Sequence, residues 1–322
     1  MKSAEERKKM EKIKIGVVGI GMVGAPLARW FFEKGWERNE NIFCFDADPK
    51  KGFFDDVSRA NIIFICVPTP PNADGSCNTS IVESVVSRFA DSGKVLVIKS
   101  TVPPETVKIL AEKYNCVILF NPEFLTEAQA WEDFVRPDRQ IVAAANEKSR
   151  KWISVVLNLL PLGSFQSPGV KGTYCFHEAD STETETAKYG GNAFGAMKVV
   201  FANVIADLCE LLDVDYENVR CLISHDRRIG GAWMDINRGN YRGFGGFCFP
   251  KDLDALIAKY GEKFAQAGIK DKKRKKKYEL AIGFLKAIRD YNEALLESQY
   301  LAPGNVCHHD AQVNENIKKQ KN

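Results

Sequence analysis

Short apolar runs alternate with amphipathic segments through the first half of the sequence, and this alternation limits the possible folds more than any other feature. Repetition of an apolar run and a helical segment is typical of βα units around a parallel sheet. We therefore predict an α/β fold with a doubly wound parallel sheet. The predicted strands are Ile13–Gly19, Asn41–Asp46, Asn61–Val67, Lys94–Ser100, Cys116–Phe120, Gln140–Ala144 and Thr173–His177. The predicted helices are Met22–Lys34, Ser80–Ala90, Pro104–Lys113 and Glu147–Leu160.

The hydrophobic period changes from Ser181 onward, where apolar residues recur at helical spacing. The second half is therefore predicted to be a mostly α-helical domain with a structured, glycine-rich loop at Gly230–Phe249. The predicted helices of this half are Thr184–Cys209, Lys251–Tyr260 and Tyr278–Gln299. The predicted divisions are a solvated N-terminal arm at 1–12, the α/β domain at 13–180, the helical domain at 181–300 and a disordered tail at 301–322.

The composition is that of a globular protein, with 45% hydrophobic and 27% charged residues. The formal net charge of +3 is small for 322 residues, so we expect no nucleic acid and no membrane surface as partner, and any basic site must be local. Nine cysteines occur without a C-x-x-C pair, and no apolar stretch approaches the roughly 20 residues that span a bilayer. These features favour a cytoplasmic chain with reduced thiols and no metal site.

Two polar segments stand outside the apolar pattern. The run Lys270–Lys277 contains seven cations and is interpreted as a solvated loop and helix start, with the attraction of a phosphorylated substrate as the alternative. The adjacent residues Cys307, His308 and His309 form a cluster that is too short to predict a metal site.

A glycine motif of the type G-x-G-x-x-G lies at Gly19–Gly24, directly after a predicted strand and at the start of a predicted helix. The first glycine permits a tight turn, the second lets the backbone approach a pyrophosphate, and the third lets the helix pack on the strand. An ordinary strand-to-helix turn is the alternative. The next strand ends in Asp46, where a carboxylate can accept hydrogen bonds from both ribose hydroxyls of an adenosine. This arrangement predicts a Rossmann-type domain that binds NAD.

The choice of NAD over NADP depends on charge, because a carboxylate at Asp46 repels a 2′-phosphate. Arg29, Lys50 and Lys51 lie nearby in the sequence and leave NADP open. Loops that follow parallel strands border the bound ligand, so the segments CVPTP at Cys66–Pro70 and STVPP at Ser100–Pro104 are expected beside the nicotinamide. The predicted cofactor-binding residues are Gly19, Ile20, Gly21, Met22, Val23, Gly24, Asp46, Val67, Pro68, Thr69, Ser100, Thr101 and Glu127.

Four further segments carry polar groups that packing alone does not explain. They are NPEFL at Asn121–Leu125, PDR at Pro137–Arg139, KYGGNAF at Lys188–Phe194 and GFGGFCFPKD at Gly243–Asp252. Together with GIGMVG, CVPTP and STVP, they resemble the motifs of the UDP-glucose/GDP-mannose dehydrogenase family in their order, spacing and residue types. The resemblance covers about Lys14 to Gln299.

On this resemblance, Cys248 corresponds to a catalytic nucleophile. A cysteine suits the four-electron oxidation of a primary alcohol to a carboxylate, because thiolate attack on the intermediate aldehyde gives a thiohemiacetal that is oxidised to a thioester. Water then releases the acid, and two NAD are consumed for each sugar. The flanking glycines allow the backbone to approach the sugar, and a nearby lysine favours the thiolate.

The resemblance also implies roles for other residues. Lys188 and Asn192, four apart on a predicted helix, are expected to stabilise charge on the oxygen at the reacting carbon. Asp252 is expected to work with an ordered water in proton transfer, and Glu123 with Thr101 to activate water for thioester hydrolysis. The expected substrate-binding residues are Phe124, Leu125, Arg228, Phe244, Gly245 and Gly246, with Arg228 reaching across a subunit boundary.

Each of these residues has a structural alternative. Cys248 is alternatively a small buried hydrophobe, Lys188 a solvated helix residue, and Asp252 the cap of the helix after Pro250. Glu123 is alternatively a loop carboxylate that pairs with Arg139. A surface salt bridge explains Arg228 equally well.

The resemblance implies a homodimer built around the helix Thr184–Cys209, and a core-spanning helix is the alternative. It also implies a second Rossmann-like domain that holds the nucleotide of the sugar nucleotide, yet no run of βα units follows Gln299. Another polypeptide supplies that domain, or the substrate is smaller or held differently, or the chain is an NAD-binding remnant without turnover.

The leading hypothesis is NAD-dependent oxidation of the C6 alcohol of a nucleotide sugar, UDP-glucose before GDP-mannose, to the uronic acid. A two-electron hydroxyacid dehydrogenase is the second hypothesis, although its chemistry needs no nucleophile such as Cys248. An NAD-binding partner subunit is the third. It would bind NAD without turning over any alcohol.

Overall fold

The computed structural model describes residues 13–126, 129–163, 175–176, 180–237, 240–302 and 306. The chain divides into two compact units. The first unit comprises Met1–Pro70 and Asn78–Lys188, and the second comprises Pro71–Cys77 and Tyr189–Asn322. This division falls within one long helix, α8 (Ser181–Leu211), rather than at its start. The domain bounds from the sequence stay predictions.

A six-stranded sheet forms the centre of the first unit, and the predicted α/β fold is confirmed. The strand order is β2-β1-β3-β4-β5-β7, and the first five strands pair in parallel. Five short, almost wholly buried apolar strands explain this pattern, since parallel sheets are covered on both faces. The strand bounds are β1 (Ile15–Val18), β2 (Ile42–Phe45), β3 (Ile62–Ile65), β4 (Val95–Ile98), β5 (Val117–Phe120) and β7 (Ala143–Ala144).

One edge of this sheet departs from the parallel arrangement, because β7 pairs antiparallel with β5. The predicted strand Gln140–Ala144 is divided into β7 and a separate strand β6 (Gln140–Ile141), which pairs in parallel with β8 (Cys175–Phe176). The described part of the connection from β5 contains only the six-residue helix α5 (Ala130–Val135). A parallel return normally needs a longer crossover that packs on the sheet.

Helices cover the sheet of the first unit, and α5 among them was not predicted. The predicted helix Glu147–Leu160 is wrong as a single element, because the backbone tightens where the Trp152 N–H donates to the Ser149 carbonyl at 3.0 Å, and the chain forms α6 and α7. The remaining bounds are α2 (Gly24–Glu33), α3 (Ser80–Phe89), α4 (Thr106–Lys113), α6 (Glu147–Arg150), α7 (Ile153–Leu157), and the 3₁₀ turns η1 (Pro49–Lys51), η2 (Val57–Arg59) and η3 (Ala90–Ser92).

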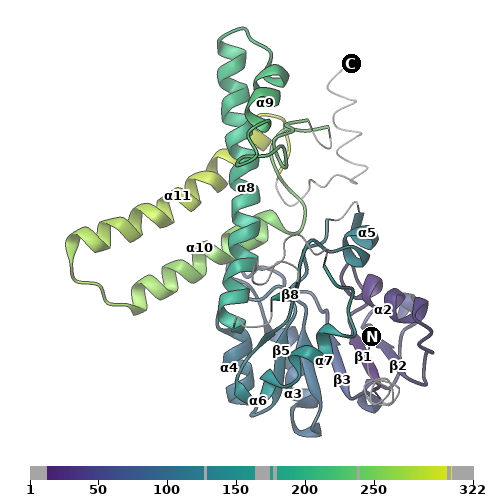
Figure 1. The fold of residues 1–322 in the computed structure, drawn as a ribbon. Coiled ribbons are helices and arrows are strands. Elements are labelled where there is room, and N and C mark those ends of the chain that lie inside the picture. The colour runs from purple at the N-terminus through teal and green to yellow at the C-terminus, as the bar shows by residue number, and fades with distance from the viewer. Residues whose placement is uncertain are drawn as a thin grey trace. The chain divides into compact units, whose positions relative to one another are not determined.

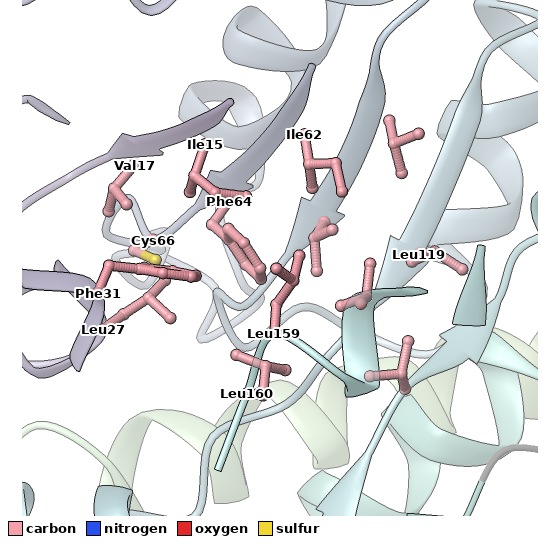
Figure 2. Close-up of a cluster of buried hydrophobic side chains, with 14 of the residues drawn as sticks. Ile15, Val17, Leu27, Phe31, Ile62, Phe64, Cys66, Leu119, Leu159 and Leu160 are labelled. Carbon is pink, nitrogen blue, oxygen red and sulfur yellow. The ribbon is translucent and has the colours of Figure 1, made fainter. Parts of the chain in front are cut away.

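Alternate residues of each strand enter two separate hydrophobic clusters, because successive strand side chains point to opposite faces. Ile62 and Phe64 of β3 belong to the first cluster, and Ile63 and Ile65 belong to the second. Figure 2 shows part of the first cluster, in which Phe31 of α2 lies near Phe64, with their ring centroids 6.1 Å apart. The core therefore fixes the sheet between helices and holds the carboxyl ends of β1 to β5 in one row.

The described part of the second unit is helical, as predicted. It contains the rest of α8, α9 (Tyr216–Ser224), α10 (Phe249–Gln266) and α11 (Lys272–Glu297), with α10 and α11 lying side by side in Figure 1. Helix α9 was not predicted. Helix α11 begins six residues before the predicted start, because Asp271 caps it by accepting a hydrogen bond from the Arg274 N–H at 2.8 Å. No helix of the described residues is long and apolar enough to span a membrane.

Candidate active site in two parts

The glycine turn of the first unit lies where the strand order changes direction, between β1 and β3. Ligands of open α/β sheets bind at this point, outside the carboxyl ends of the strands. Gly19 has φ of +91°, and a Cβ there would lie 2.7 Å from the Cys66 carbonyl oxygen. A Cβ on Gly24 would lie 1.9 Å from the Gly19 carbonyl oxygen. Gly21 faces open space instead, so its backbone can be approached by a pyrophosphate.

Asp46 follows β2 and is buried, with 8% of its surface exposed. Its carboxylate accepts hydrogen bonds from the Ile20 N–H at 2.6 Å, the Asp48 N–H at 2.9 Å and the Lys51 ammonium at 2.9 Å. Burial alone would raise the pKa of Asp46, but these hydrogen bonds outweigh it and hold the pKa below its ordinary value. Asp46 is therefore an ionised acceptor that ties the glycine turn to the end of β2.

Two of the three cations considered for NADP have other partners. Lys51 pairs with Asp46, and Arg29 pairs with Glu33 at 2.9 Å while its guanidinium lies 3.9 Å from the ring centroid of Trp131. Lys51 reduces the negative charge that a ribose phosphate would meet. The charge argument for NAD is therefore weaker at Asp46 than the sequence alone suggests.

The loops after β3 and β4 are joined by side-chain hydrogen bonds. The Ser100 hydroxyl donates to the Val67 carbonyl at 2.6 Å, and the Thr69 hydroxyl donates to the Thr101 carbonyl at 2.9 Å. Hydrogen bonds therefore join the two loops at the carboxyl ends of β3 and β4, and their place beside the nicotinamide stays a prediction. Glu127, also predicted to bind the cofactor, lies outside the described residues.

Glu123 follows β5 and pairs with Lys99, a residue that the sequence analysis missed. The Lys99 ammonium lies 3.0 Å from one carboxylate oxygen of Glu123, and the other oxygen accepts a hydrogen bond from the Phe124 N–H at 2.8 Å. Glu123 therefore forms an ion pair with Lys99, whereas the alternative from the sequence was a pair with Arg139. The signal in the sequence was a lysine that directly follows an apolar strand, where a buried cation requires a partner.

Two cationic side chains lie over the aromatic ring of Phe124. The guanidinium of Arg139 lies 3.8 Å from the ring centroid, and the Lys188 ammonium lies 5.1 Å from it. Burial lowers the pKa of Arg139 from its ordinary value. Lys188 is only 8% exposed, so the alternative of a solvated helix residue is wrong. Leu125, the neighbouring substrate candidate, packs against the first cluster of the core.

Cys248, Asp252 and Asn192 form the second part of the site. Half-buried Cys248 immediately precedes α10, and its carbonyl accepts a hydrogen bond from the Asp252 N–H at 2.9 Å. Asp252 is 1% exposed, and its carboxylate accepts hydrogen bonds from the Asn192 amide and the Lys251 ammonium. A buried acid in the first turn of a helix therefore lies one turn after the thiol. The Asn192 amide is engaged by this acid.

Helix α11 holds the loop that leads to Cys248. The Asn292 side chain donates to the Phe244 carbonyl at 2.9 Å and accepts from the Phe244 N–H at 2.7 Å. Gly243 has φ of +100°, and a Cβ there would lie 2.8 Å from the Asn292 amide oxygen. Gly195 of α8 leaves room for Phe249, because its Cβ would lie 2.6 Å from that ring. Glycine at position 195 is therefore a packing requirement, and α8 continues through Gly195 unbroken.

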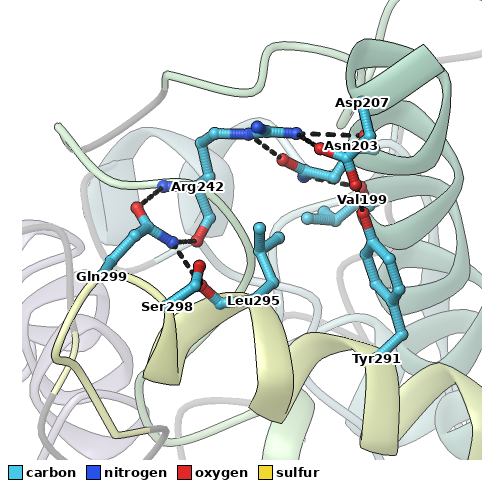
Figure 3. A network of polar contacts seen from close by, with 8 residues as sticks. All are labelled: Val199, Asn203, Asp207, Arg242, Tyr291, Leu295, Ser298 and Gln299. Atoms are coloured by element: carbon cyan, nitrogen blue, oxygen red, sulfur yellow. Dashed lines mark hydrogen bonds and ion pairs between the residues drawn. The ribbon is translucent and has the colours of Figure 1, made fainter. Parts of the chain in front are cut away.

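A second anchor lies before this loop, at Arg242, which sequence reasoning also missed. Figure 3 shows its side chain reaching α8, where it donates to Asn203 at 2.9 Å and pairs with Asp207 at 2.6 Å. The Gln299 side chain donates to the Arg242 carbonyl at 2.9 Å and accepts from its N–H at 2.8 Å. Tyr291 of α11 donates to Asp207. The start of the loop, at Arg242 and Phe244, is thus fixed by side chains of α8 and α11 and by Gln299.

The remaining substrate candidates lie in loops. Arg228 pairs with Asp226 two residues earlier, and its side chain is 84% exposed. Gly246 has φ of +75°, a conformation that favours glycine, and Gly245 precedes it. Among the described residues, no group of three or more His, Cys, Asp or Glu side chains is placed to hold a metal ion.

The chain matches two models of one family. Residues 51–159 match the NAD binding domain of the UDP-glucose/GDP-mannose dehydrogenase family, and residues 182–277 match the central domain of that family. The glycine turn lies before the first matched segment, so its geometry is evidence independent of that match. Asp252, Cys248 and Asn192 lie within the second segment.

Individual relatives agree with these models. The chain is 34% identical over 210 residues to the UDP-glucose 6-dehydrogenase of Rickettsia bellii, which covers 63% of this chain and 45% of that protein. It is 32% identical over 289 residues to the UDP-glucose 6-dehydrogenase of Rhizobium meliloti, with 76% and 63% covered. The chain thus spans between about half and two thirds of the length of these relatives.

A solved structure gives the same result. The UDP-glucose dehydrogenase of Pyrobaculum islandicum superposes with a TM-score of 0.70 at 27% identity, over 89% of this chain and 69% of that one. The order of motifs, the two matched models and the shared fold agree. The chain belongs to the UDP-glucose/GDP-mannose dehydrogenase family and carries its NAD-binding and central domains.

Proposed function

We propose that the chain oxidises the C6 alcohol of a nucleotide sugar, UDP-glucose, to the uronic acid with NAD. The observation that carries this proposal is the position of Cys248 one helical turn before buried Asp252, which is bound to Asn192, in a chain of a family with an NAD-binding domain. The relatives named UDP-glucose 6-dehydrogenase support this substrate.

The residues of the first unit fit a dinucleotide. The open backbone at Gly21 and the N-terminus of α2 suit the pyrophosphate, and the ionised carboxylate of Asp46 suits the ribose. A cavity of about 190 Å³ beside β1 and β2 suits the adenine, and it is lined by Val18, Phe45, Asp55, Val57, Ser84, Val85, Arg88 and Phe89. Bound NAD accepts the hydride, and two NAD are used for each sugar.

Cys248 supplies the covalent chemistry in this proposal. After the alcohol has lost a hydride and a proton, the Cys248 thiolate adds to the aldehyde carbon to form a thiohemiacetal. Loss of a second hydride leaves a thioester on the sulfur. The N-terminus of α10 favours the thiolate, because a helix start carries partial positive charge.

Neighbouring residues handle protons and charge. Asp252 receives the alcohol proton through an ordered water, and the Asn192 amide keeps the carboxylate in place. Lys188 and Asn192 stabilise the developing charge on the reacting oxygen. Glu123 and Thr101, at the ends of adjacent parallel strands, activate the water that releases the acid. The loop at Phe244, Gly245 and Gly246, together with Phe124, Leu125 and Arg228, contacts the sugar nucleotide.

We also propose that the protein is a homodimer. Helix α8 exposes five large apolar side chains in the second unit, with exposed fractions between 42% and 84%, and their spacing of three or four residues or of seven places them along one side of the helix. Such a stripe is typical of an interface. The residues are Phe194, Phe201, Val204, Leu208 and Leu211. Sedimentation of the native chain and of Phe201→Asp tests this, and a native monomer contradicts it.

A substrate panel tests the proposed activity. The purified chain is given NAD with UDP-glucose, GDP-mannose or simple hydroxyacids. The formation of NADH is followed by its absorbance. Turnover of UDP-glucose supports the proposal. Turnover of hydroxyacids alone would instead identify a two-electron dehydrogenase, and NAD binding without any turnover would identify a partner subunit.

A further inference from the structure

Lys99, directly after β4, places a charge in the interior of the first unit. Its side chain is 1% exposed, against 17% for its partner Glu123. Besides the carboxylate at 3.0 Å, its ammonium donates to the Asn121 amide oxygen at 2.8 Å. A buried cation loses its hydration, and an apolar side chain would fill the same space without that cost. Stability alone therefore does not explain a lysine at this position.

The surroundings of Lys99 hold its ammonium in one place. The Asn121 amide nitrogen donates to the Gln140 side-chain oxygen at 2.8 Å and to the Ile141 carbonyl at 2.7 Å. The Gln140 amide nitrogen in turn donates to the Pro161 carbonyl at 2.9 Å. Because backbone carbonyls only accept hydrogen bonds, they fix both amide orientations, and the oxygen of Asn121 must face Lys99.

Both oxygens of Glu123 are held by this arrangement. Lys99 donates to one oxygen and the Phe124 N–H donates to the other. Burial raises the pKa of the Cys66 thiol to about 12, so this neighbour is neutral, and Arg139 lies over the ring of Phe124. Lys99 therefore holds one oxygen of Glu123 through a buried ion pair.

We propose that Lys99 is a positioning residue for the release of the acid, acting through Glu123. This inference rests on the proposed function. In the release step a water oxygen attacks the thioester carbonyl while its proton passes to Glu123. The carbon–sulfur bond then breaks, and Cys248 leaves as the thiolate. Glu123 can take the proton only while its carboxylate is correctly oriented, and the Lys99 ammonium and the Phe124 N–H, each bound to one oxygen, hold that orientation.

The test is a rapid-mixing experiment on the full chain with NAD and UDP-glucose, comparing the native chain with Lys99→Met. NADH formed before the steady state reports the hydride steps, and intact mass reports the acyl group on Cys248. We expect the burst of NADH to be unchanged in Lys99→Met. We expect acid release to slow by about tenfold or more, so that the thioester accumulates.

A double-variant comparison separates positioning from general stability. If Lys99 acts through Glu123, Lys99→Met in a Glu123→Gln background slows release no further. Further slowing in that background would contradict the proposal. The control is Lys113→Met, which breaks a Lys–Glu pair on the surface and is expected to leave both phases unchanged.

Every outcome of the experiment decides the proposal. Native turnover combined with unchanged acid release in Lys99→Met, or with a slower NADH burst, overturns the role of Lys99 alone. No turnover by the native chain overturns the proposed function, and this inference with it. If Lys99→Met does not fold by circular dichroism, Lys99→Gln replaces it, since glutamine can still donate to Asn121 but carries no charge.

Discussion

The two units hold their functional side chains in different ways. In the first unit, Asp46, Thr101 and Glu123 lie within a few residues of the ends of parallel strands, so the sheet itself aligns them. In the second unit, Cys248 follows a glycine-rich loop that is held by side chains such as Asn292 from a distant helix. A sheet edge gathers residues through its topology, whereas a loop needs a separate anchor for each part of its path.

The sharpest separation of the two units comes from Cys248→Ala. We expect complete loss of acid formation, because no other group replaces the thiolate in the thioester route. NAD affinity, measured by calorimetry, should match that of the native chain. Loss of NAD binding in this variant would show that the two units do not divide the work in this way.

Cys66 of the first unit should react with an alkylating agent far more slowly than the less buried Cys248 and Cys221 of the second unit. Burial raises the pKa of Cys66 in the first unit from 9.0 to about 12, so its reactive thiolate forms only as the pH nears that value. Half-buried Cys248 and exposed Cys221 belong to the second unit. Alkylation of the native chain at neutral pH, mapped by peptide mass, should modify Cys248 and Cys221 well before Cys66. Equal rates would contradict the burial of Cys66.

Removal of the loop anchor should affect the second unit alone. Asn292→Ala leaves the N–H and carbonyl of buried Phe244 without their partner, which costs about 1–3 kcal/mol for each group. We expect a lower melting temperature and a fall of about 100-fold in kcat, because displacement of a reacting group by about 1 Å has an effect of this size. Unchanged kcat would mean that the loop keeps its path without Asn292.

A smaller effect is expected from Asp46→Ala in the first unit. Loss of the carboxylate should weaken NAD binding by about tenfold while affecting NADP little, because only the ribose hydroxyls of NAD lose an acceptor. An unchanged ratio of the two affinities, measured by fluorescence titration, would refute the ribose assignment. Ser298→Ala, a surface change on the second unit, is the control.

The smallest expected effect is the change in the free energy of unfolding when Asp46 is titrated with acid. The pKa of Asp46 is lower in the folded chain than its ordinary value of 3.8. Ionised Asp46 therefore stabilises the folded chain at any pH above the pKa that Asp46 has in the unfolded chain. This stabilisation is lost as the pH falls through the pKa of Asp46 in the folded chain. In urea unfolding between about pH 5 and pH 2, the native chain should lose more stability than Asp46→Asn. Parallel curves would contradict the hydrogen bonds assigned to Asp46.

The sequence predicted the first unit well for a physical reason. The strands are short, apolar and buried, and a glycine pattern between a strand and a helix has few geometric solutions. The loops at Ser100 and Thr69 follow buried strands as expected, and their role at the cofactor stays a prediction. The direction of β7 was not predictable, because two alanines carry no signal for parallel or antiparallel pairing.

The contacts that support the site were harder to predict. The side chains that hold the site contact residues 24 to 57 positions away in the sequence, as at Lys99, Asn292 and Arg242. No local sequence pattern connects residues so far apart. Asp271 shows a different limitation, since its cap extends α11 through a basic run that propensity at a helix start disfavours. Tertiary contacts decided these positions. Roles for Cys248 and its neighbours came from the family resemblance and stay proposals.

The most direct test of the proposed route is the count of NADH formed for each UDP-glucose consumed by the purified chain with excess NAD. Two hydride transfers, joined by a thiohemiacetal on Cys248 and ending in a thioester, predict two NADH for each sugar, with the uronic acid as product. One NADH for each sugar, with an aldehyde or ketone as product, would contradict the account and remove the reason for a nucleophile at Cys248.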